Sequence, residues 1–83
     1  MTYPTVHLNG TSRDDLERQI ENASLACRKA IIALEEAQPN ARDYYTQGGD
    51  ALRSAIREHN ARVAKIQDVL NQLSDIYEHI VNH

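Results

Sequence analysis

Apolar residues recur with heptad spacing along two long stretches of this 83-residue chain. In both stretches the steps between apolar or small positions alternate between four and three residues, the pattern of a helix that packs along its length against another helix. A β-strand would instead show a period of two, so the sequence predicts an all-α protein with two long helices. The positions are Leu16, Ile20, Ala23, Cys27, Ala30, Leu34 and Ala37 in the first stretch, and Leu52, Ile56, His59, Val63, Ile66, Leu70, Leu73, Tyr77 and Ile80 in the second.

Local signals mark the ends of these helices. Ser12 followed by Asp15 resembles a capping box. Pro39 ends the first helix, because the residue before a proline avoids helical geometry. A Gly-Gly pair then permits a turn, and Asp50 after it is a suitable N-cap for the second helix. We predict a single helical-hairpin domain with an extended arm at 1–11, a helix at 13–37, a loop at 38–50 and a helix at 51–81.

The short connection predicts an antiparallel hairpin. If the loop turns near Asp43, Leu34 faces the level of Arg53 and Leu16 faces the level of Leu70. The second helix then overhangs by roughly a dozen residues, or about 18 Å at 1.5 Å per residue. That overhang is rich in apolar residues, so we expect the N-terminal arm, through Tyr3, Val6 and Leu8, or a second chain to cover it.

Four further apolar residues lie off the main seam. Leu25 and Ile32 fall on the outer face of the first helix, and Val69 and Ile76, together with the small residue Ala55, widen the apolar stripe of the second. A two-helix hairpin has only one internal seam, so a second stripe indicates an oligomer interface. We predict a homo-oligomer, most simply a dimeric four-helix bundle, or a higher oligomer. The alternative is that the arm and the loop fold back onto these residues.

The loop segment NARDYYTQGG is the strongest candidate for a ligand site. A tyrosine ring of Tyr44 or Tyr45 can stack on a base while the guanidinium of Arg42 holds a phosphate. Arg53 and Arg57, at the start of the second helix, would add positive charge. The alternative is that the tyrosines pack on the helix ends and that Arg42 pairs with Asp43 or Asp50.

Charge is distributed unevenly along the chain. The net charge is −3, which weighs against general nucleic-acid binding. Residues 28–65 are near +2, and the remainder is near −5. The loop end therefore favours a small anion, although such charges are often only a solvated surface.

No catalytic or cofactor motif is present, and we expect neither catalysis nor a bound cofactor. Cys27 lies at a core position without an activating base, so it acts as a small hydrophobe. His79 and His83 have the spacing of a metal-binding pair but lack a third ligand, so we expect no metal. His59 falls on the apolar seam, where it either sets the register of the helices or lies partly exposed with one hydrogen bond.

The location follows from what the sequence lacks. The lone cysteine rules out an internal disulfide and favours a reducing compartment. The N-terminus has no signal-peptide pattern, and no apolar run approaches the ~20 residues that span a bilayer. We therefore expect a soluble cytoplasmic protein that makes no membrane contact.

Three segments carry a resemblance: VHLNGTS, the alanine-rich first helix, and PNARDYYTQG before the second helix. In these the chain resembles a loose group of small phage-encoded helical proteins, over most of its length. Its size and hairpin form also resemble the phage anti-CBASS sponges that capture cyclic nucleotides, although in architecture only. The resemblance implies a non-enzymatic phage accessory protein in the host cytoplasm. Its implied role is anti-defence, in which the protein sequesters a nucleotide immune signal. The alternative is an interaction module that inhibits or adapts a host or phage protein, such as a host defence protein, or a small structural phage protein.

Overall fold

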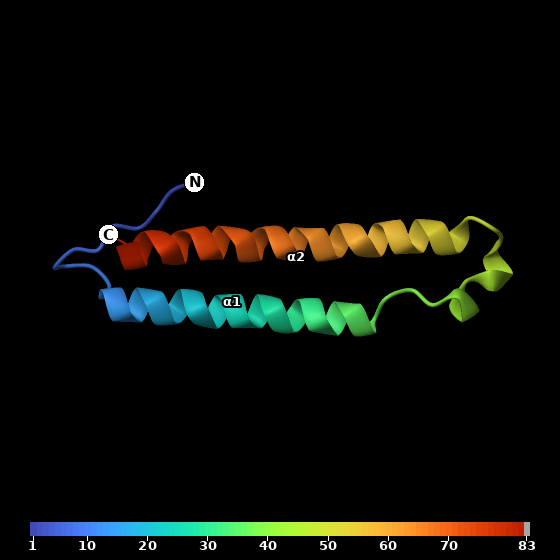
Figure 1. Cartoon of the computed structure of the whole chain (residues 1–83), viewed down its shortest axis with the longest axis horizontal. Coiled ribbons are helices and arrows are strands. Elements are labelled where there is room, and N and C mark those ends of the chain that lie inside the picture. The colour runs from blue at the N-terminus through green and yellow to red at the C-terminus, as the bar shows by residue number, and fades with distance from the viewer. Residues whose placement is uncertain (83) are drawn as a thin grey trace.

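The computed structural model describes residues 1–82 and shows two long helices packed as an antiparallel hairpin (Figure 1). Helix α1 spans Arg13–Glu36 and helix α2 spans Ala51–Asn82. Two short 3-10 turns, η1 (Ala41–Asp43) and η2 (Tyr45–Gln47), occupy the connection. The molecule is a rod of 62 × 21 × 17 Å. The predicted all-α hairpin is confirmed, with each helix ending within one residue of its expected bound.

Helix α1 begins and ends where its capping residues require. The Ser12 hydroxyl accepts a hydrogen bond from the Asp15 backbone N–H at 3.2 Å, which satisfies one of the free donors of the first turn. At the other end, the Ala37 N–H bonds back to the carbonyls of Ala33 and Leu34 before Pro39 breaks the helical path.

No helix within residues 1–82 is both long and apolar enough to cross a membrane.

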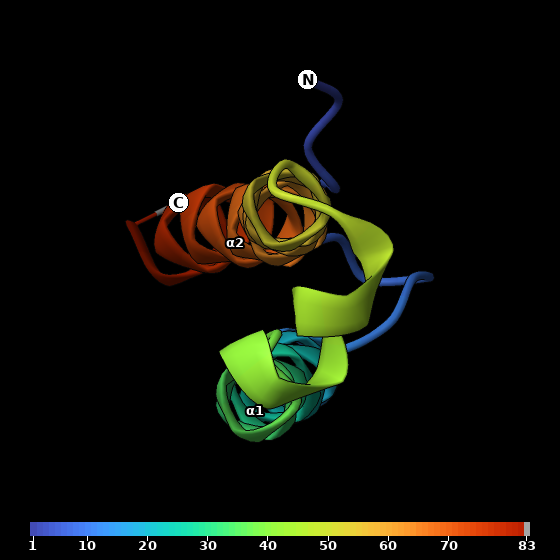
Figure 2. The same cartoon turned by 90° about the vertical axis from the view of Figure 1, so that its right-hand side faces the viewer.

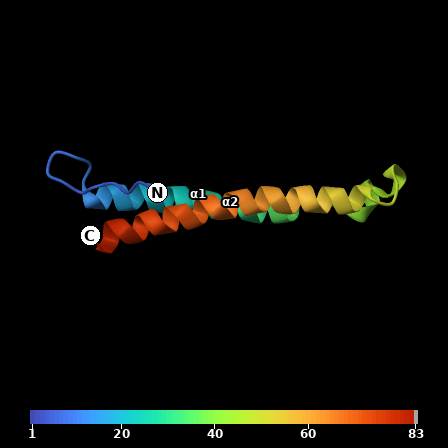
Figure 3. The ribbon, with the colours of Figure 1, turned by 90° about the horizontal axis from the view of Figure 1, so that it is seen from above.

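The seam between the helices is the core, and it is thin. Most heptad positions are half-buried, whereas Ile56 remains 41% exposed. Within residues 1–82, the buried side chains are those of Ser24, His59 and Ile80, and only that of Ile80 is fully buried. Two helices can exclude water from only one line of contact, and the helices cross at a shallow angle (Figure 3). Side chains that flank the line therefore keep much of their surface in water.

The register of the hairpin differs from the expected one. The His59 Nε2 atom lies 2.8 Å from the Leu34 carbonyl oxygen, and the Tyr77 hydroxyl donates to the Glu21 carboxylate at 2.8 Å. Leu34 is therefore level with His59 rather than Arg53, and the predicted overhang at the C-terminus of α2 is wrong. The last turns of α2 lie beside the first turns of α1, and the extra length of α2 extends beyond α1 at the loop end (Figure 1).

The loop explains this shift. It does not turn symmetrically about Asp43 but continues outward from α1 through η1 and η2, and returns only at the far end of α2 (Figure 1). Seen from the loop end, both 3-10 turns lie in front of the helices, and η2 contacts α2 (Figure 2). The connection thus spans the unpaired first turns of α2.

The N-terminal arm packs on its own chain. The Tyr3 ring stacks on the His79 ring with centroids 4.5 Å apart and planes 11° apart. Pro4 and Val6 lie beside Ile80, which is only 1% exposed. A turn closed by the Gly10 N–H and the His7 carbonyl then leads into α1, with Leu8 98% exposed. Tyr3 and Val6 therefore cover the end of α2 as expected, and Leu8 does not.

Candidate binding surfaces

The loop is built from bonds between near neighbours. The Asn40 side-chain oxygen accepts from the Arg42 N–H at 3.0 Å and starts η1. The Gln47 N–H bonds to the Tyr44 carbonyl at 3.0 Å within η2. Gly48 then adopts φ 106° and ψ 167°, a conformation almost confined to glycine, and turns the chain into α2. The loop is consequently a pair of tight turns at the tip of the rod.

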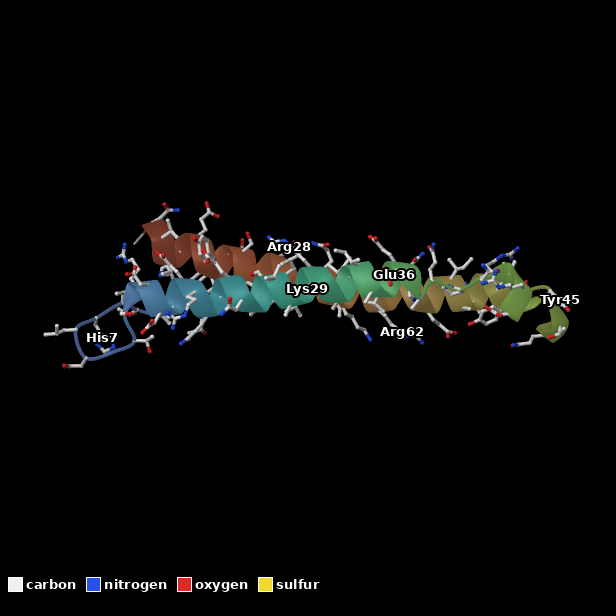
Figure 4. All side chains as sticks on the ribbon, turned by 90° about the horizontal axis from the view of Figure 1, so that it is seen from below. His7, Arg28, Lys29, Glu36, Tyr45 and Arg62 are labelled. Carbon is white, nitrogen blue, oxygen red and sulfur yellow. The ribbon has the colours of Figure 1, made fainter. Side chains whose placement is uncertain are left out.

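Three of the expected ligand residues occupy this tip. Tyr45 is 79% exposed at the end of the molecule (Figure 4), and Tyr44 is half-buried. Arg42 is exposed and forms no ion pair within residues 1–82, so the alternative pairing of Arg42 with Asp43 or Asp50 is not observed. An aromatic ring and a guanidinium are therefore both accessible at the tip.

The two candidate arginines at the start of α2 bond to near neighbours in the sequence. Arg53 pairs with Asp50 at 3.6 Å, and Arg57 donates to the Ser54 hydroxyl at 3.3 Å. Within residues 1–82, no hydrogen bond or ion pair joins Arg53 or Arg57 to the three loop residues. The Arg53–Asp50 pair is exposed on both sides, and such pairs contribute only about 0–1 kcal/mol. Asp50 therefore holds the Arg53 guanidinium only weakly.

A second candidate surface runs along the middle of the rod. Leu25 is 49% exposed, Ile32 56% and Val69 47%, and Ile76 is half-buried. In heptad terms Leu25 and Ile32 lie opposite the seam on α1, while Val69 and Ile76 flank the seam on α2. In an antiparallel pair, equivalent flanking positions of the two helices lie on the same side of the seam. Ala26 and Ala33 therefore lie on the same side as Val69 and Ile76, and Leu25 and Ile32, which directly precede these alanines, lie on the adjoining outer face of α1. We define the apolar side as the surface that extends from that outer face over the alanines to the two α2 residues: Leu25, Ala26, Ile32, Ala33, Val69 and Ile76.

Neither the arm nor the loop covers the apolar side. The arm lies over His79 and Ile80, and the loop lies beyond the end of α1. The alternative in which these segments fold back onto Leu25 and Ile32 is therefore wrong. In Figure 4 the viewer looks onto α1, with Arg28 near one edge of the hairpin and Arg62 near the other. Arg62 shares the edge of the apolar side, since it lies one heptad before Val69.

The opposite side of the seam contains a polar hollow. Ser24 and Ser74, from facing helices, line a hollow of about 230 Å³ together with Glu21, Arg28 and Tyr77. The hydrogen bond to Glu21 raises the pKa of the Tyr77 phenol above its ordinary value, and burial and the charges of Glu21 and Glu17 act in the same direction. Sequence analysis missed this contact, because it depends on the true register. The contrast between the two sides makes the apolar side stand out.

A further hollow lies at the terminal end. It measures about 360 Å³ and is lined by acidic and aromatic residues of the arm and of α2: Tyr3, Asp75, Glu78, His79 and Asn82. The arm has no periodic pattern, so no spacing rule predicts its path. Within residues 1–82, no three His, Cys, Asp or Glu side chains form a metal-binding group. The His79–His83 pair cannot be assessed, because His83 lies outside the described residues.

The two polar residues of the seam have structural places. His59 is 7% exposed, and its Nε2 carries a proton, because the Leu34 carbonyl can only accept. It is a buried residue that joins α2 to the last turn of α1, and not a partly exposed one. Cys27 is a free, half-buried thiol on the seam. Both residues belong to the helix contact.

No family model, curated protein or solved structure matches the chain. The geometry itself presents two surfaces with binding chemistry. The apolar side offers exposed aliphatic groups in the middle of the rod. The loop tip offers an exposed tyrosine and an arginine that is unpaired within residues 1–82.

Proposed function

We propose that the protein is a non-enzymatic binding protein that works as a homodimer. The apolar sides of two hairpins pack against each other and form a four-helix bundle. A two-fold dimer uses the same patch on both copies, so the apolar side supplies both halves of the interface. Leu25, Ile32 and Val69 then lose their exposure to water.

One observation carries this proposal: the single chain exposes too much surface. Its accessible area is 6273 Å², whereas a folded monomer of 9.4 kDa typically exposes about 5,000 Å². The excess of about 1,300 Å² is larger than the ~800 Å² that each partner loses in a typical specific interface. A second hairpin removes an area of this size, and the arm and loop are already placed elsewhere.

Sedimentation equilibrium of charge variants tests the dimer. Ile32→Glu should weaken association on the order of 100-fold or more, because burying an unpaired carboxylate costs several kcal/mol. Asn60→Glu is the matched control, since Asn60 is exposed on the polar side of α2 and the variant carries the same added charge. Equal dissociation constants for wild type and Ile32→Glu would contradict the proposed interface.

A second candidate function is capture of a small anionic ligand at the loop tip. It is supported by the 79% exposure of Tyr45 beside Arg42, whose guanidinium is unpaired within residues 1–82. A ring that stacks on a base and a guanidinium that binds phosphate match a nucleotide. Its most concrete form is the one implied by the phage resemblance, namely sequestration of a nucleotide immune signal.

Calorimetry with a panel of cyclic nucleotides tests this candidate. Binding heat should appear with at least one nucleotide and vanish in a Tyr44→Ala/Tyr45→Ala variant. Thr46→Ala, in the same 3-10 turn, is the control and should retain binding. Flat traces over the whole panel would remove the nucleotide candidate and leave the homodimer proposal standing.

A further inference from the structure

The charge asymmetry of the sequence becomes an asymmetry along the rod. Residues 28–36, the loop and residues 51–65 form one half of the hairpin, which we call the loop half (Figure 1). The arm, residues 13–27 and residues 66–82 form the terminal half. The loop half carries seven basic and five acidic residues, for a net charge of +2. The terminal half carries two basic and seven acidic residues, for a net charge of −5.

We infer that the two hairpins of the dimer pack antiparallel, with the loop half of each copy against the terminal half of the other. This inference rests on the proposed homodimer and specifies the orientation of its partner. Parallel packing would place −5 beside −5, whereas antiparallel packing places +2 beside −5 at both ends. The dimer axis then crosses the rod near its middle, and each chain meets the same surface of its partner.

The separation of the helices lets this electrostatic preference persist in salt. Packed helices lie about 8–10 Å apart, and the Debye length at physiological ionic strength is about 8 Å. Charges on facing helices are therefore only partly screened, while charges at opposite ends of a 62 Å rod do not interact. Orientation is decided by which half faces which.

Residues bordering the apolar side agree with this orientation. Val69 lies near the middle of α2 (Ala51–Asn82), and the two hydrogen bonds between the helices place Leu25 close to its level. A two-fold axis at Val69 exchanges positions before and after it along α2. Arg62 of one copy then lies near the level of Asp75 in the other. A parallel dimer would instead place each of these residues level with the same residue of the partner.

The orientation has a consequence for the loop tips. Tyr45 lies at the tip of the hairpin (Figure 4), so in an antiparallel dimer the two Tyr45 side chains project from opposite ends of the assembly. Two tips separated by most of a 62 Å rod cannot share one small ligand. Each tip is therefore an independent site, with one ligand per chain.

Double electron–electron resonance, which measures the distance between two spin labels, tests the orientation with one label on each chain. Gln47→Cys in a Cys27→Ala background carries the label on the loop tip. In the antiparallel dimer with its axis at Val69, the two labels should be about 55 Å or more apart, twice the rise of α2 from Ala51 to Val69 at 1.5 Å per residue. A parallel dimer would bring them to about 20 Å, twice the spacing of packed helices.

The outcomes separate the inference from the proposal beneath it. A dimer with the long distance supports the antiparallel orientation. A dimer with the short distance overturns it and leaves the homodimer intact, whereas a monomer overturns both. Thr46→Cys repeats the measurement at a neighbouring position, and circular dichroism of each labelled variant confirms that both helices are present.

Discussion

The loop end of the hairpin is held by backbone hydrogen bonds between near neighbours, whereas the terminal end is held by side chains from distant segments. At the loop end, Asn40 caps η1, and Tyr45 remains in water. At the terminal end, Tyr3 stacks on His79, and Ile80 is buried under the arm. Local turns leave the tip side chains free for contacts, while the packed arm closes the other end. The two ends therefore differ in which changes destabilise them.

The largest effect is expected at Ile80. Replacing this buried side chain with alanine leaves a cavity under the arm, and such truncations cost about 2–5 kcal/mol. Val81→Ala is the control, since Val81 is 43% exposed and should change stability little. Urea unfolding at one protein concentration compares them. If both variants unfolded at the same urea concentration, packing of Ile80 under the arm would not be what stabilises the terminal end.

At the loop end, the largest effect is expected at Gly48. Its φ of 106° and ψ of 167° suit only glycine, so Gly48→Ala should cost about 1–3 kcal/mol through backbone strain. Gly49→Ala is a matched control, because neither Cβ would meet an atom within 4 Å and Gly49 has no positive φ. The difference in thermal unfolding between the two variants measures the cost of backbone strain at Gly48. If Gly49→Ala were the more damaging change, the turn would be built differently.

A smaller effect is expected from the stacked pair. Tyr3→Ala removes the ring contact with His79, and aromatic pairs contribute about 0.5–1.5 kcal/mol beyond their buried area. Hydrogen exchange should accelerate in the last turns of α2 and stay unchanged in η1 and η2. Leu8→Ala, at a 98% exposed position of the same arm, should change neither. Acceleration over the whole chain would show that the ends are not independent.

The smallest effect is expected from the bond between Tyr77 and Glu21, and it depends on pH. Because folding raises the pKa of Tyr77, the stabilisation is fully present below the ordinary value of 10.0 and is lost as pH rises through the raised pKa. The stability difference between wild type and Tyr77→Phe should therefore be constant up to about that pH and shrink above it. Tyr45→Phe should follow the wild type throughout. A stability difference that instead grows as pH rises would contradict the claim that folding raises the pKa of Tyr77.

Periodicity and capping residues were enough to predict the two helices and the hairpin, since these depend on local sequence. The register was not predictable in the same way, because the heptad pattern fits several alignments of the two helices equally well. His59 and Leu34 were both assigned to the seam, but their pairing depends on how far the loop extends beyond α1. The contact of Tyr3 with His79 joins residues far apart in the chain, and no spacing rule reports it.

The same distinction applies to the candidate surfaces. The exposed residues Leu25, Ile32 and Val69 were predictable, because their heptad positions place them off the seam. The accessibility of Arg42 and Tyr45 was not, because it depends on two 3-10 turns that carry the loop beyond the helices. The polar hollow at Ser24 and Ser74 likewise required the true register.

Native mass spectrometry of the unmodified protein tests the central claim that the middle of the rod, and not either end, holds the partner. We predict an assembly of two chains, twice the 9.4 kDa of one, that persists in the Tyr44→Ala/Tyr45→Ala variant and is lost in Ile32→Glu. A wild-type chain that remains at 9.4 kDa at micromolar concentration would contradict the claim.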